Sequence, residues 1–418
     1  MMIIKKMATV VVSVILMSSL AMGADWPGFR NADRTGQSSE KNLMDKWPEG
    51  GPKELWSVTG LGLGYSSAAI AKGVVYTTGV DPETKEGFIF AYDLKGKPIW
   101  KKSYGPGWKG SYKGARTTPV IENDRLYIMT GYGVAKCFDA KTGDPKWSVD
   151  TLGTFKGKNI TWGISESILI AGDKVICSPG GDDASLVALD KMTGQTKWTT
   201  KGLSEKSAYC SPIVVKYANR NIVITMLENS FVGVDADSGE VLWKEKNPKK
   251  PGSAYGNINP VSPVYHNGYF YITSGYKCGG AMFQIAKDGK GVKQIWDDAE
   301  LDVHHGGVVY IDGYLYASSH AANSGKWMCV DFMTGKVMYA DKGLGAQGST
   351  IAANGKLYCW DEKKGNLALV NATPKGFDII SSFKIEKGDK EFWAHPAISD
   401  AVMYVRHGDV LMAYDIKK

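Results

Sequence analysis

Cysteine is scarce in this sequence, and the few cysteines are not arranged for metal, haem or disulfide-exchange chemistry. Six cysteines lie among 418 residues, no two are adjacent, and neither C-x-x-C nor C-x-x-C-H occurs. These absences exclude motif-type zinc sites, c-type haem attachment and thioredoxin-like redox centres. Cys137 and Cys329 each precede a turn aspartate by two residues. Because that position alternates toward the interior of a sheet, we expect buried thiols.

Long apolar runs are also missing once the first residues are passed, which excludes later membrane-spanning helices. The start of the chain has Lys5 and Lys6, an apolar stretch over 8–20 that is too short to span a bilayer, and small residues at positions 21 and 23. This pattern predicts a signal peptide over residues 1–23 with cleavage before Ala24. No cysteine follows the junction, so we expect no lipid anchor. We therefore predict an exported protein, periplasmic or secreted.

A strong excess of charge of one sign is absent as well. The formal net charge is +7, and removal of Lys5 and Lys6 leaves +5. The densest basic run, between 244 and 250, is interrupted by Glu245, so a solvated loop is favoured over a surface for an acidic partner or a membrane. No Gly-rich phosphate loop occurs. We expect no nucleic-acid partner.

What the sequence does contain is a repeat. Residues 187–198 read as a short apolar strand, an Asp-x-x-Thr-Gly turn and a second strand that ends in Trp198. The aspartate can accept N–H bonds within the turn, the glycine supplies a positive φ, and the tryptophan packs between neighbouring sheets. The phrase recurs along the chain, with the aromatic residue at Trp56, Trp100, Trp147, Trp198, Trp243, Trp296, Tyr339 and Phe383.

The spacing of these aromatic residues predicts the fold. Successive steps are 44, 47, 51, 45, 53, 43 and 44 residues, a period typical of a four-stranded propeller blade. We predict an all-β, eight-bladed β-propeller of antiparallel blades, with the strand at 54–58 completing the last blade and closing the ring. The chain then divides into a signal peptide (1–23), an extended N-terminal segment (24–53) that plugs or staples the propeller, and one propeller domain (54–418).

Each blade opens with a small or hydroxyl residue that should line the central channel. Aligning the blades places the following residues in one column around the axis: Ser67, Thr118, Ser167, Ser211, Ser262, Gly307, Ser349 and His395. Small side chains fit where eight strands converge, so His395 stands out. Packing explains these serines, and a hydrolase triad is not supported.

The residues just before this column should form the rim of the channel mouth. A concave axial pocket with convergent polar groups is where we expect a ligand. The predicted ligand-binding residues are Tyr65, Arg116, Trp162, Glu166, Tyr209, Asn259, His304, His305, Gln347, Trp393 and His395.

Three rim histidines raise the question of a metal site. His304 and His305 are adjacent and precede two glycines, which permit the bend that would turn both toward one ion, and His395 could supply a third ligand. The alternative is that one histidine hydrogen-bonds a ligand or a carbonyl while another caps a loop. We favour the second interpretation, because no ligand spacing in the sequence enforces the first.

Glu166 and His305 are the candidates for catalytic residues. Trp162 and Glu166 lie together near the mouth, where the tryptophan could stack on a planar cofactor or a sugar and the carboxylate could act as a base or bind a cation. Equally, the tryptophan could pack on the neighbouring blade while Glu166 pairs with Arg116.

The repeated phrase Ala-x-Asp-x-x-Thr-Gly-x-x-x-Trp, as in 188–198, resembles the pyrroloquinoline quinone (PQQ) repeat of quinoprotein-type propellers. That superfamily includes PQQ-dependent alcohol dehydrogenases and the propeller subunit of the outer-membrane β-barrel assembly machinery. The segments at 25–30, 162–163, 304–307 and 393–396 are similar to exported propellers described as PQQ-binding-like or polyvinyl-alcohol-dehydrogenase-like. The resemblance implies the propeller fold and, for an enzyme of this kind, PQQ with calcium or a lanthanide.

Two functional hypotheses remain open. The first is a binding module that takes a small molecule, a glycan or a cell-envelope protein on its axial face. The second is a PQQ- or metal-dependent oxidoreductase acting on an alcohol or a carbohydrate. The dehydrogenases of the superfamily commonly carry a vicinal Cys–Cys disulfide, which this sequence lacks, so the first hypothesis is preferred. We expect a monomer.

Overall fold

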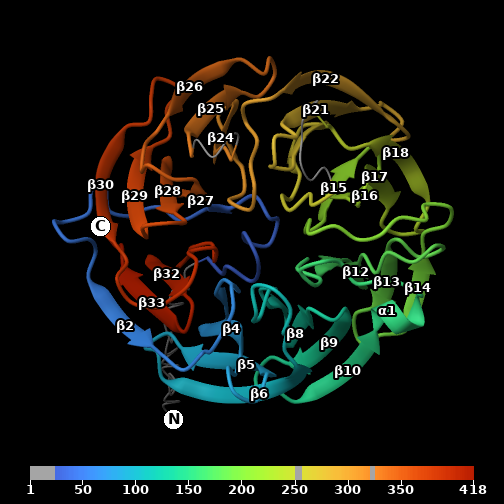
Figure 1. The fold of residues 1–418 in the computed structure, drawn as a ribbon, viewed down its shortest axis with the longest axis horizontal. Helices are drawn as coiled ribbons and strands as arrows, with labels where there is room; N and C mark the ends of the chain where they lie inside the picture. Colours follow the sequence, from blue (N-terminus) through green and yellow to red (C-terminus); the bar gives the residue numbers. More distant parts are fainter. Residues whose placement is uncertain (1–23, 250–256, 321–324) are drawn as a thin grey trace, which may run out of the picture.

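The computed structural model describes residues 24–249, 257–320 and 325–418. The predicted signal peptide lies outside these residues. The described strands form eight separate sheets, which Figure 1 shows as a ring around a central axis. The four-residue α1 (Thr151–Thr154) is the one α-helix of the described chain. None of the described helices is long and apolar enough to cross a membrane.

Blades 1 to 4 each contain four consecutive antiparallel strands. Their strands are β3 (Ala69–Ala71), β4 (Val74–Val80), β5 (Glu86–Asp93) and β6 (Pro98–Pro106); β7 (Val120–Glu122), β8 (Arg125–Met129), β9 (Val134–Asp139) and β10 (Pro145–Asp150); β11 (Leu169–Ala171), β12 (Lys174–Cys177), β13 (Val187–Asp190) and β14 (Thr196–Thr199); β15 (Ile213–Tyr217), β16 (Arg220–Met226), β17 (Ser230–Asp235) and β18 (Val241–Lys246).

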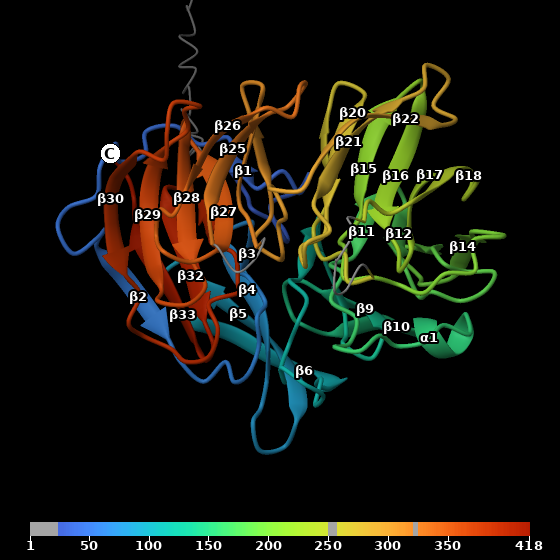
Figure 2. The ribbon, with the colours of Figure 1, turned by 45° about the horizontal axis from the view of Figure 1, so that its top comes forward.

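Blades 5 to 8 continue the ring, and Figure 2 shows them around the same axis in a tilted view. Their strands are β19 (Val264–His266), β20 (Tyr269–Thr273), β21 (Gly280–Ile285) and β22 (Val292–Asp298); β23 (Val309–Ile311), β24 (Tyr314–Ser318), β25 (Trp327–Asp331) and β26 (Val337–Asp341); β27 (Gly348–Ala353), β28 (Lys356–Asp361), β29 (Asn366–Asn371) and β30 (Ile379–Lys384); β31 (Ala397–Ser399), β32 (Val402–His407), β33 (Val410–Asp415) and β2 (Glu54–Val58).

Blade 8 closes the ring with a strand from the other end of the propeller sequence. Its order is β2-β33-β32-β31, and β2 pairs antiparallel with β33, placing Trp56 opposite Ala413. The predicted eight-bladed fold and its closure by the strand at 54–58 are therefore confirmed. Closure in this manner leaves no open sheet edge between the first and last blades.

The repeated turn works as the sequence predicts. In the turn after β13, Asp190 Oδ1 accepts the N–H groups of Met192 and Thr193 at 2.9 Å. Gly194 has φ +76°, and a Cβ there would lie 3.0 Å from the ring of Trp147 in the preceding blade. Trp147 Nε1 also donates to Lys191 O at 3.0 Å. The same kind of bond, to a carbonyl in the turn of the next blade, is made by Trp56, Trp100, Trp198 and Trp296.

The predicted column of small residues joins the blades around the channel. Ser67 N donates to Thr118 Oγ1 at 3.0 Å, Ser167 N donates to Ser211 Oγ at 2.9 Å, and His395 N donates to Ser67 Oγ at 2.9 Å. Hydroxyl side chains suit this column because they are small enough for the crowded axis and still accept an N–H from the neighbouring blade. The predicted burial of the thiols is also confirmed, because all six cysteines are buried and free.

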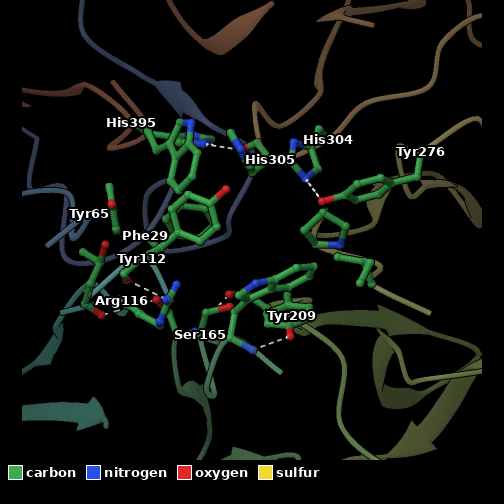
Figure 3. Close-up of a pocket in the computed structure, with 17 residues that line it drawn as sticks. Phe29, Tyr65, Tyr112, Arg116, Ser165, Tyr209, Tyr276, His304, His305 and His395 are labelled. Carbon is green, nitrogen blue, oxygen red and sulfur yellow. Dashed lines mark hydrogen bonds between the residues drawn. The ribbon is translucent and has the colours of Figure 1, made fainter. Parts of the chain in front are cut away.

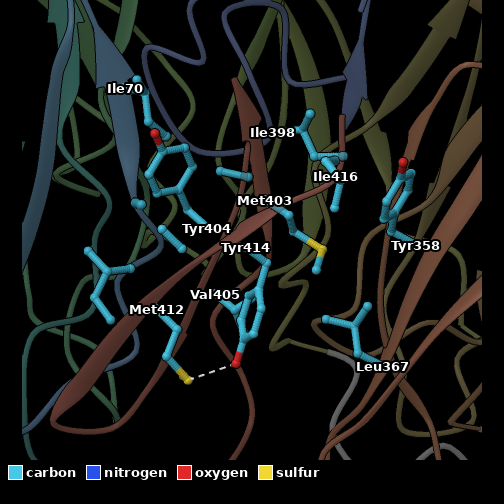
Figure 4. Close-up of a cluster of buried hydrophobic side chains, with 14 of the residues drawn as sticks. Ile70, Tyr358, Leu367, Ile398, Met403, Tyr404, Val405, Met412, Tyr414 and Ile416 are labelled. Atoms are coloured by element: carbon cyan, nitrogen blue, oxygen red, sulfur yellow. Dashed lines mark hydrogen bonds between the residues drawn. The ribbon is translucent and has the colours of Figure 1, made fainter. Parts of the chain in front are cut away.

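The N-terminal segment crosses the channel and then wraps one side of the ring. Trp26 pairs with Ile70 of β3, and β1 (Gln37–Ser38) adds a parallel strand to β27. Trp26 and Trp47 are both buried in a cluster shared with blades 7, 8 and 1; Figure 4 shows part of this cluster around Tyr404. The segment is thus built into the core.

Arg30 anchors this segment inside the channel. Its Nη1 donates to Thr350 O at 2.9 Å and its Nη2 to Val308 O at 2.6 Å. It also lies 3.2 Å from His395 Nδ1. A Cβ on Gly307 would lie 2.1 Å from the guanidinium. The two residues that break the column of hydroxyls, Gly307 and His395, are therefore those that receive Arg30.

We expect Arg30→Met to lower the free energy of unfolding by about 3 kcal/mol, because the buried carbonyls of Thr350 and Val308 lose their donors. Urea unfolding followed by tryptophan fluorescence measures the change. Arg125→Met is the matched control, since within the described part of the chain the guanidinium of Arg125 makes one weak contact, from Nη1 to Cys137 Sγ at 4.0 Å. It should cost less than about 1 kcal/mol. Equal losses for the two variants would contradict the anchoring role.

Candidate functional site

The site is a cavity of about 240 Å³ at one end of the channel. Loops from blades 1 to 6 and 8 and the N-terminal segment contribute to it, and Figure 3 shows their side chains converging. Its lining residues are Phe29, Tyr65, Tyr112, Arg116, Thr118, Trp162, Ser165, Ser167, Tyr209, Ser211, Ile258, Pro260, Tyr276, His304, His305, Trp393 and His395.

The N-terminal segment supplies the floor of this axial pocket. Along each inner strand, the rim residues come before the column of small residues. Arg30 and Arg34 bind carbonyls of the column residues or of the residues that follow them. Arg34, for example, donates to Ser167 O and Ile168 O at 2.7 Å. Phe29, which comes directly before Arg30, packs against His395 with ring centroids 5.0 Å apart. The N-terminal segment therefore lies across the channel below the pocket.

The walls are aromatic and are held in place by neighbours. Trp393 lies against Tyr65 and Tyr112, with ring centroids 4.8 and 5.0 Å apart. Across the pocket, the ring centroids of Trp162 and Tyr209 are 5.6 Å apart, and Trp162 N donates to the Tyr209 hydroxyl at 2.9 Å. Tilted aromatic walls of this kind present flat apolar surfaces to a planar ring or to the apolar face of a sugar.

Arg116 gives the pocket a positive charge. Its Nη2 donates to the carbonyls of Ser111 and Tyr112 at 2.8 and 2.7 Å, which fixes the guanidinium at the blade 2 side of the pocket (Figure 3). Burial lowers the pKa of Arg116 to about 10, so the side chain is cationic at neutral pH. The lining residues include no Asp or Glu. The pocket therefore attracts an anionic group.

The pocket histidines are neutral. Burial, with the charges of neighbouring groups, lowers the pKa of His305 and of His395 to about 3, and burial lowers the pKa of His304 well below its usual value. Since Arg30 can only donate, His395 Nδ1 must accept, and Nε2–H then donates to His305 O at 2.8 Å. Both nitrogens of His395 are occupied.

His395 is not available as the third ligand of the candidate metal site, because both of its ring nitrogens are engaged. His304 Nε2 is also engaged, at 2.8 Å from the Tyr276 hydroxyl. Within 24–249, 257–320 and 325–418, no group of three or more His, Cys, Asp or Glu side chains is placed to hold a metal ion. The alternative interpretation, in which a histidine hydrogen-bonds a carbonyl, describes His395.

Eight of the eleven residues predicted to bind ligand do line the pocket. They are Tyr65, Arg116, Trp162, Tyr209, His304, His305, Trp393 and His395. The other three do not line it. Asn259 is fully buried and donates to Leu227 O at 2.7 Å, and Gln347 donates to Glu362 Oε1 at 2.6 Å. Each amide is engaged by a neighbouring group of its own loop surroundings.

Glu166 is the largest correction among the site residues. Its neighbours Ser165 and Ser167 line the pocket, and because alternate residues of an extended segment point in opposite directions, Glu166 points away. It is fully buried, and Oε1 accepts Ser178 N at 2.6 Å. Its charged neighbour is Arg34, and no ion pair with Arg116 forms. Glu166 therefore cannot act as the predicted base or cation ligand of the pocket.

Three aromatic residues of the pocket escaped the sequence prediction. Phe29 comes from the N-terminal segment, Tyr112 from the loop between β6 and β7, and Tyr276 from the loop that follows β20. The column argument considered only residues directly before each inner strand. Tyr112 lies four residues before Arg116 in the same loop, so its nearness to a rim residue could have indicated its place in the pocket. The place of Tyr276 depends on how the loop after β20 folds back, which the sequence does not indicate.

The comparison with known proteins agrees with the PQQ-type repeat found in the sequence. The family model described as "Outer membrane protein assembly factor BamB" matches residues 85–341. The chain belongs to this family of PQQ-repeat propellers. BamB of Moranella endobia is 22% identical over 287 residues, which cover 66% of this chain and 70% of that protein.

Quinoprotein dehydrogenases are relatives as well. The ethanol dehydrogenase of Pseudomonas aeruginosa is 24% identical over 212 residues, covering 43% of this chain and 33% of the enzyme. The alcohol dehydrogenase PedH of Pseudomonas putida is 27% identical over 153 residues, covering 35% of this chain and 25% of the enzyme. The matched part thus spans a third or less of the length of these two enzymes.

Solved structures agree on the PQQ-repeat fold. BamB from Moraxella catarrhalis has a TM-score of 0.63 and 16% identity, over 87% of this chain and 99% of that one. The quinohemoprotein alcohol dehydrogenase from Comamonas testosteroni also has a TM-score of 0.63, with 13% identity, over 94% of this chain and 81% of that one. Identities this low show a common fold and do not transfer an activity.

The pocket does not fit PQQ held with calcium or a lanthanide. Hard cations require several oxygen ligands, mainly carboxylates and amide carbonyls. None of the side chains that line the pocket is Asp, Glu, Asn or Gln. The aromatic walls and Arg116 suit a planar anion, but the donor set does not suit the metal ion that accompanies the quinone.

The buried Glu166 makes the stability of this propeller depend on pH. Burial raises its pKa from 4.5 to about 7. A carboxyl group whose folded pKa is raised stabilises the fold below its unfolded pKa, and that contribution is lost as pH rises through the folded value. We therefore expect the free energy of unfolding of Glu166→Gln, relative to that of the parent, to rise by ~3 kcal/mol from pH 4.5 to pH 8.

Urea unfolding across this pH range measures the difference between parent and variant. Glu386→Gln is the control, because Glu386 is exposed, and its difference from the parent should stay flat. Parallel pH profiles for the parent and Glu166→Gln would contradict a raised pKa of the buried Glu166 carboxyl group.

Proposed function

We propose that this protein is a binding module whose axial pocket takes a small molecule that carries one ring and one negative charge. The observation that supports this proposal is the pocket itself. Aromatic side chains form its walls, Phe29 closes its floor, and Arg116 supplies its one formal charge at neutral pH. About 240 Å³ is room for a single six-membered ring with its substituents.

Arg116 is prepared for an anion. Its Nε is buried without a partner, and among the described residues its hydrogen bonds all leave from Nη2. Nη1 is left to donate a charge-assisted hydrogen bond to an anion. The carbonyls of Ser111 and Tyr112 hold the guanidinium in position, so little side-chain entropy is lost on binding.

The proposal includes export, which rests on the signal-peptide pattern over 1–23. A periplasmic or secreted binding module is compatible with relatives described as outer membrane protein assembly factors. Dehydrogenase activity has weaker support, because the matched part of the quinoprotein enzymes is small and the pocket lacks oxygen ligands for their metal ion.

Titrations of tryptophan fluorescence test the proposal, since Trp162 and Trp393 line the pocket. We expect benzoate and galacturonate to bind more tightly than benzyl alcohol and galactose. Arg116→Met should weaken the two acids at least tenfold, which is about 1.4 kcal/mol, and should leave the neutral pair unchanged. Arg125→Met is the control for removal of an arginine.

Two results would contradict the proposal. One is equal binding of acids and neutral partners in the parent protein. The other is tight binding of PQQ with calcium, accompanied by a quinone absorption band and oxidation of an alcohol, which would establish the dehydrogenase hypothesis instead.

A further inference from the structure

A groove leads out of the axial pocket and carries unpaired positive charge. It has a volume of about 630 Å³ and is lined by residues of the loops before β3, β7 and β31. Tyr65 and Tyr112 line both the groove and the axial pocket, so the two spaces adjoin at these side chains. Lys109, Lys113 and Lys390 line the groove.

Some lysines of the blades pair with carboxylates of neighbouring turns, as Lys102 does with Asp144 at 3.1 Å and Lys174 with Asp237 at 3.2 Å. The three groove lysines belong to the described lysines that do not. Among the described residues, no carboxylate lies within ion-pair distance of the three groove lysines, and all three are exposed. Unpaired cations collected beside one pocket attract an anionic ligand.

The loop that carries Lys109 and Lys113 is held in a fixed shape. Gly114 N donates to Trp108 O at 3.0 Å, and Trp108 Nε1 donates to Ser111 O at 3.1 Å. Gly64 pairs with Ala115, and a Cβ on Gly64 would lie 2.9 Å from the Ala115 backbone. The groove wall is therefore preformed and continuous with Arg116.

Glu391 is the one carboxylate among the residues that line the groove, and it lies where the groove meets the axial pocket. Glu391 Oε2 accepts the Tyr65 hydroxyl at 2.9 Å. This bond fixes the ring of Tyr65 against Trp393, where the groove meets the axial pocket. The pocket and the groove together are lined by four cationic side chains, Arg116 and the three lysines, and by one carboxylate, Glu391.

We propose that the ligand is a short acidic oligosaccharide, with one sugar ring in the axial pocket and the carboxylates of the following rings in the lysine groove. This inference rests on the proposed function and names its ligand class. Pyranose rings stack on tilted aromatic side chains, and a uronic-acid chain carries one carboxylate per ring, which matches cations spread over two loops. Arg116 binds the first carboxylate and the three lysines bind those that follow.

A nucleotide is the less favoured ligand. Phosphates are usually bound by clustered backbone N–H groups at a Gly-rich loop and helix start, or by bidentate arginines. The groove lining contains no arginine, and the sequence has no phosphate-loop motif. Flexible lysine ammonium groups suit carboxylates that are spaced along a chain.

Calorimetric titration with galacturonate, digalacturonate and trigalacturonate tests the inference. We expect trigalacturonate to bind at least tenfold more tightly than galacturonate, and this gain to shrink as salt rises. The triple variant Lys109→Gln/Lys113→Gln/Lys390→Gln should lose the gain while it binds galacturonate like the parent. The triple variant Lys41→Gln/Lys95→Gln/Lys375→Gln removes exposed lysines elsewhere and should keep the gain.

The outcomes separate this inference from the proposed function. Galacturonate binding that depends on Arg116, without any gain from a longer chain, overturns the inference and leaves the proposed function standing. If galacturonate does not bind, or if Arg116→Met binds it as tightly as the parent does, the proposed function itself is overturned. Tighter binding of uridine diphosphate than of trigalacturonate, lost in the groove variant, assigns the lysines to phosphate and overturns the oligosaccharide. Maltotriose binding as tight as trigalacturonate also overturns it.

Discussion

The contact between a tryptophan and the turn of the next blade is the interaction on which this ring depends. Trp198 Nε1 donates to Ala236 O at 3.0 Å, and its ring covers Gly239, whose φ is +80°. A side chain at Gly239 would need both the strained φ and the space of the indole. In the described chain, five blades are joined to the next by a tryptophan Nε1 bond of this kind, and β2 closes the ring in blade 8.

Closure of the ring creates a channel, and the N-terminal segment decides what the channel becomes. Arg30 crosses to blades 6, 7 and 8, so Phe29 is presented as a floor beside His395. The segment therefore lies across the channel below the pocket. The same arginine fixes the tautomer of His395, which removes that histidine from metal or proton chemistry and leaves it as a structural contact.

The electrostatics of the mouth then follow from burial and loop geometry. The mouth combines neutral histidines, aromatic walls and a fixed Arg116, and the exposed lysines of the groove extend the positive field outward. Low-identity likeness to both assembly factors and dehydrogenases fits this view, since a shared propeller scaffold carries different loops. Function in this protein lies in side chains that the repeat itself does not specify.

The sequence by itself determined the blade count, the closing strand, the interblade tryptophans and the ring of hydroxyls, because these features repeat and each copy supports the interpretation of the others. It also located most of the pocket, since residues just before each inner strand must approach the axis. Only the tertiary structure placed Tyr276 in the pocket and turned Glu166 away from it. Those positions depend on how non-repeating loops bend and which buried groups they must satisfy, and no periodic pattern records that.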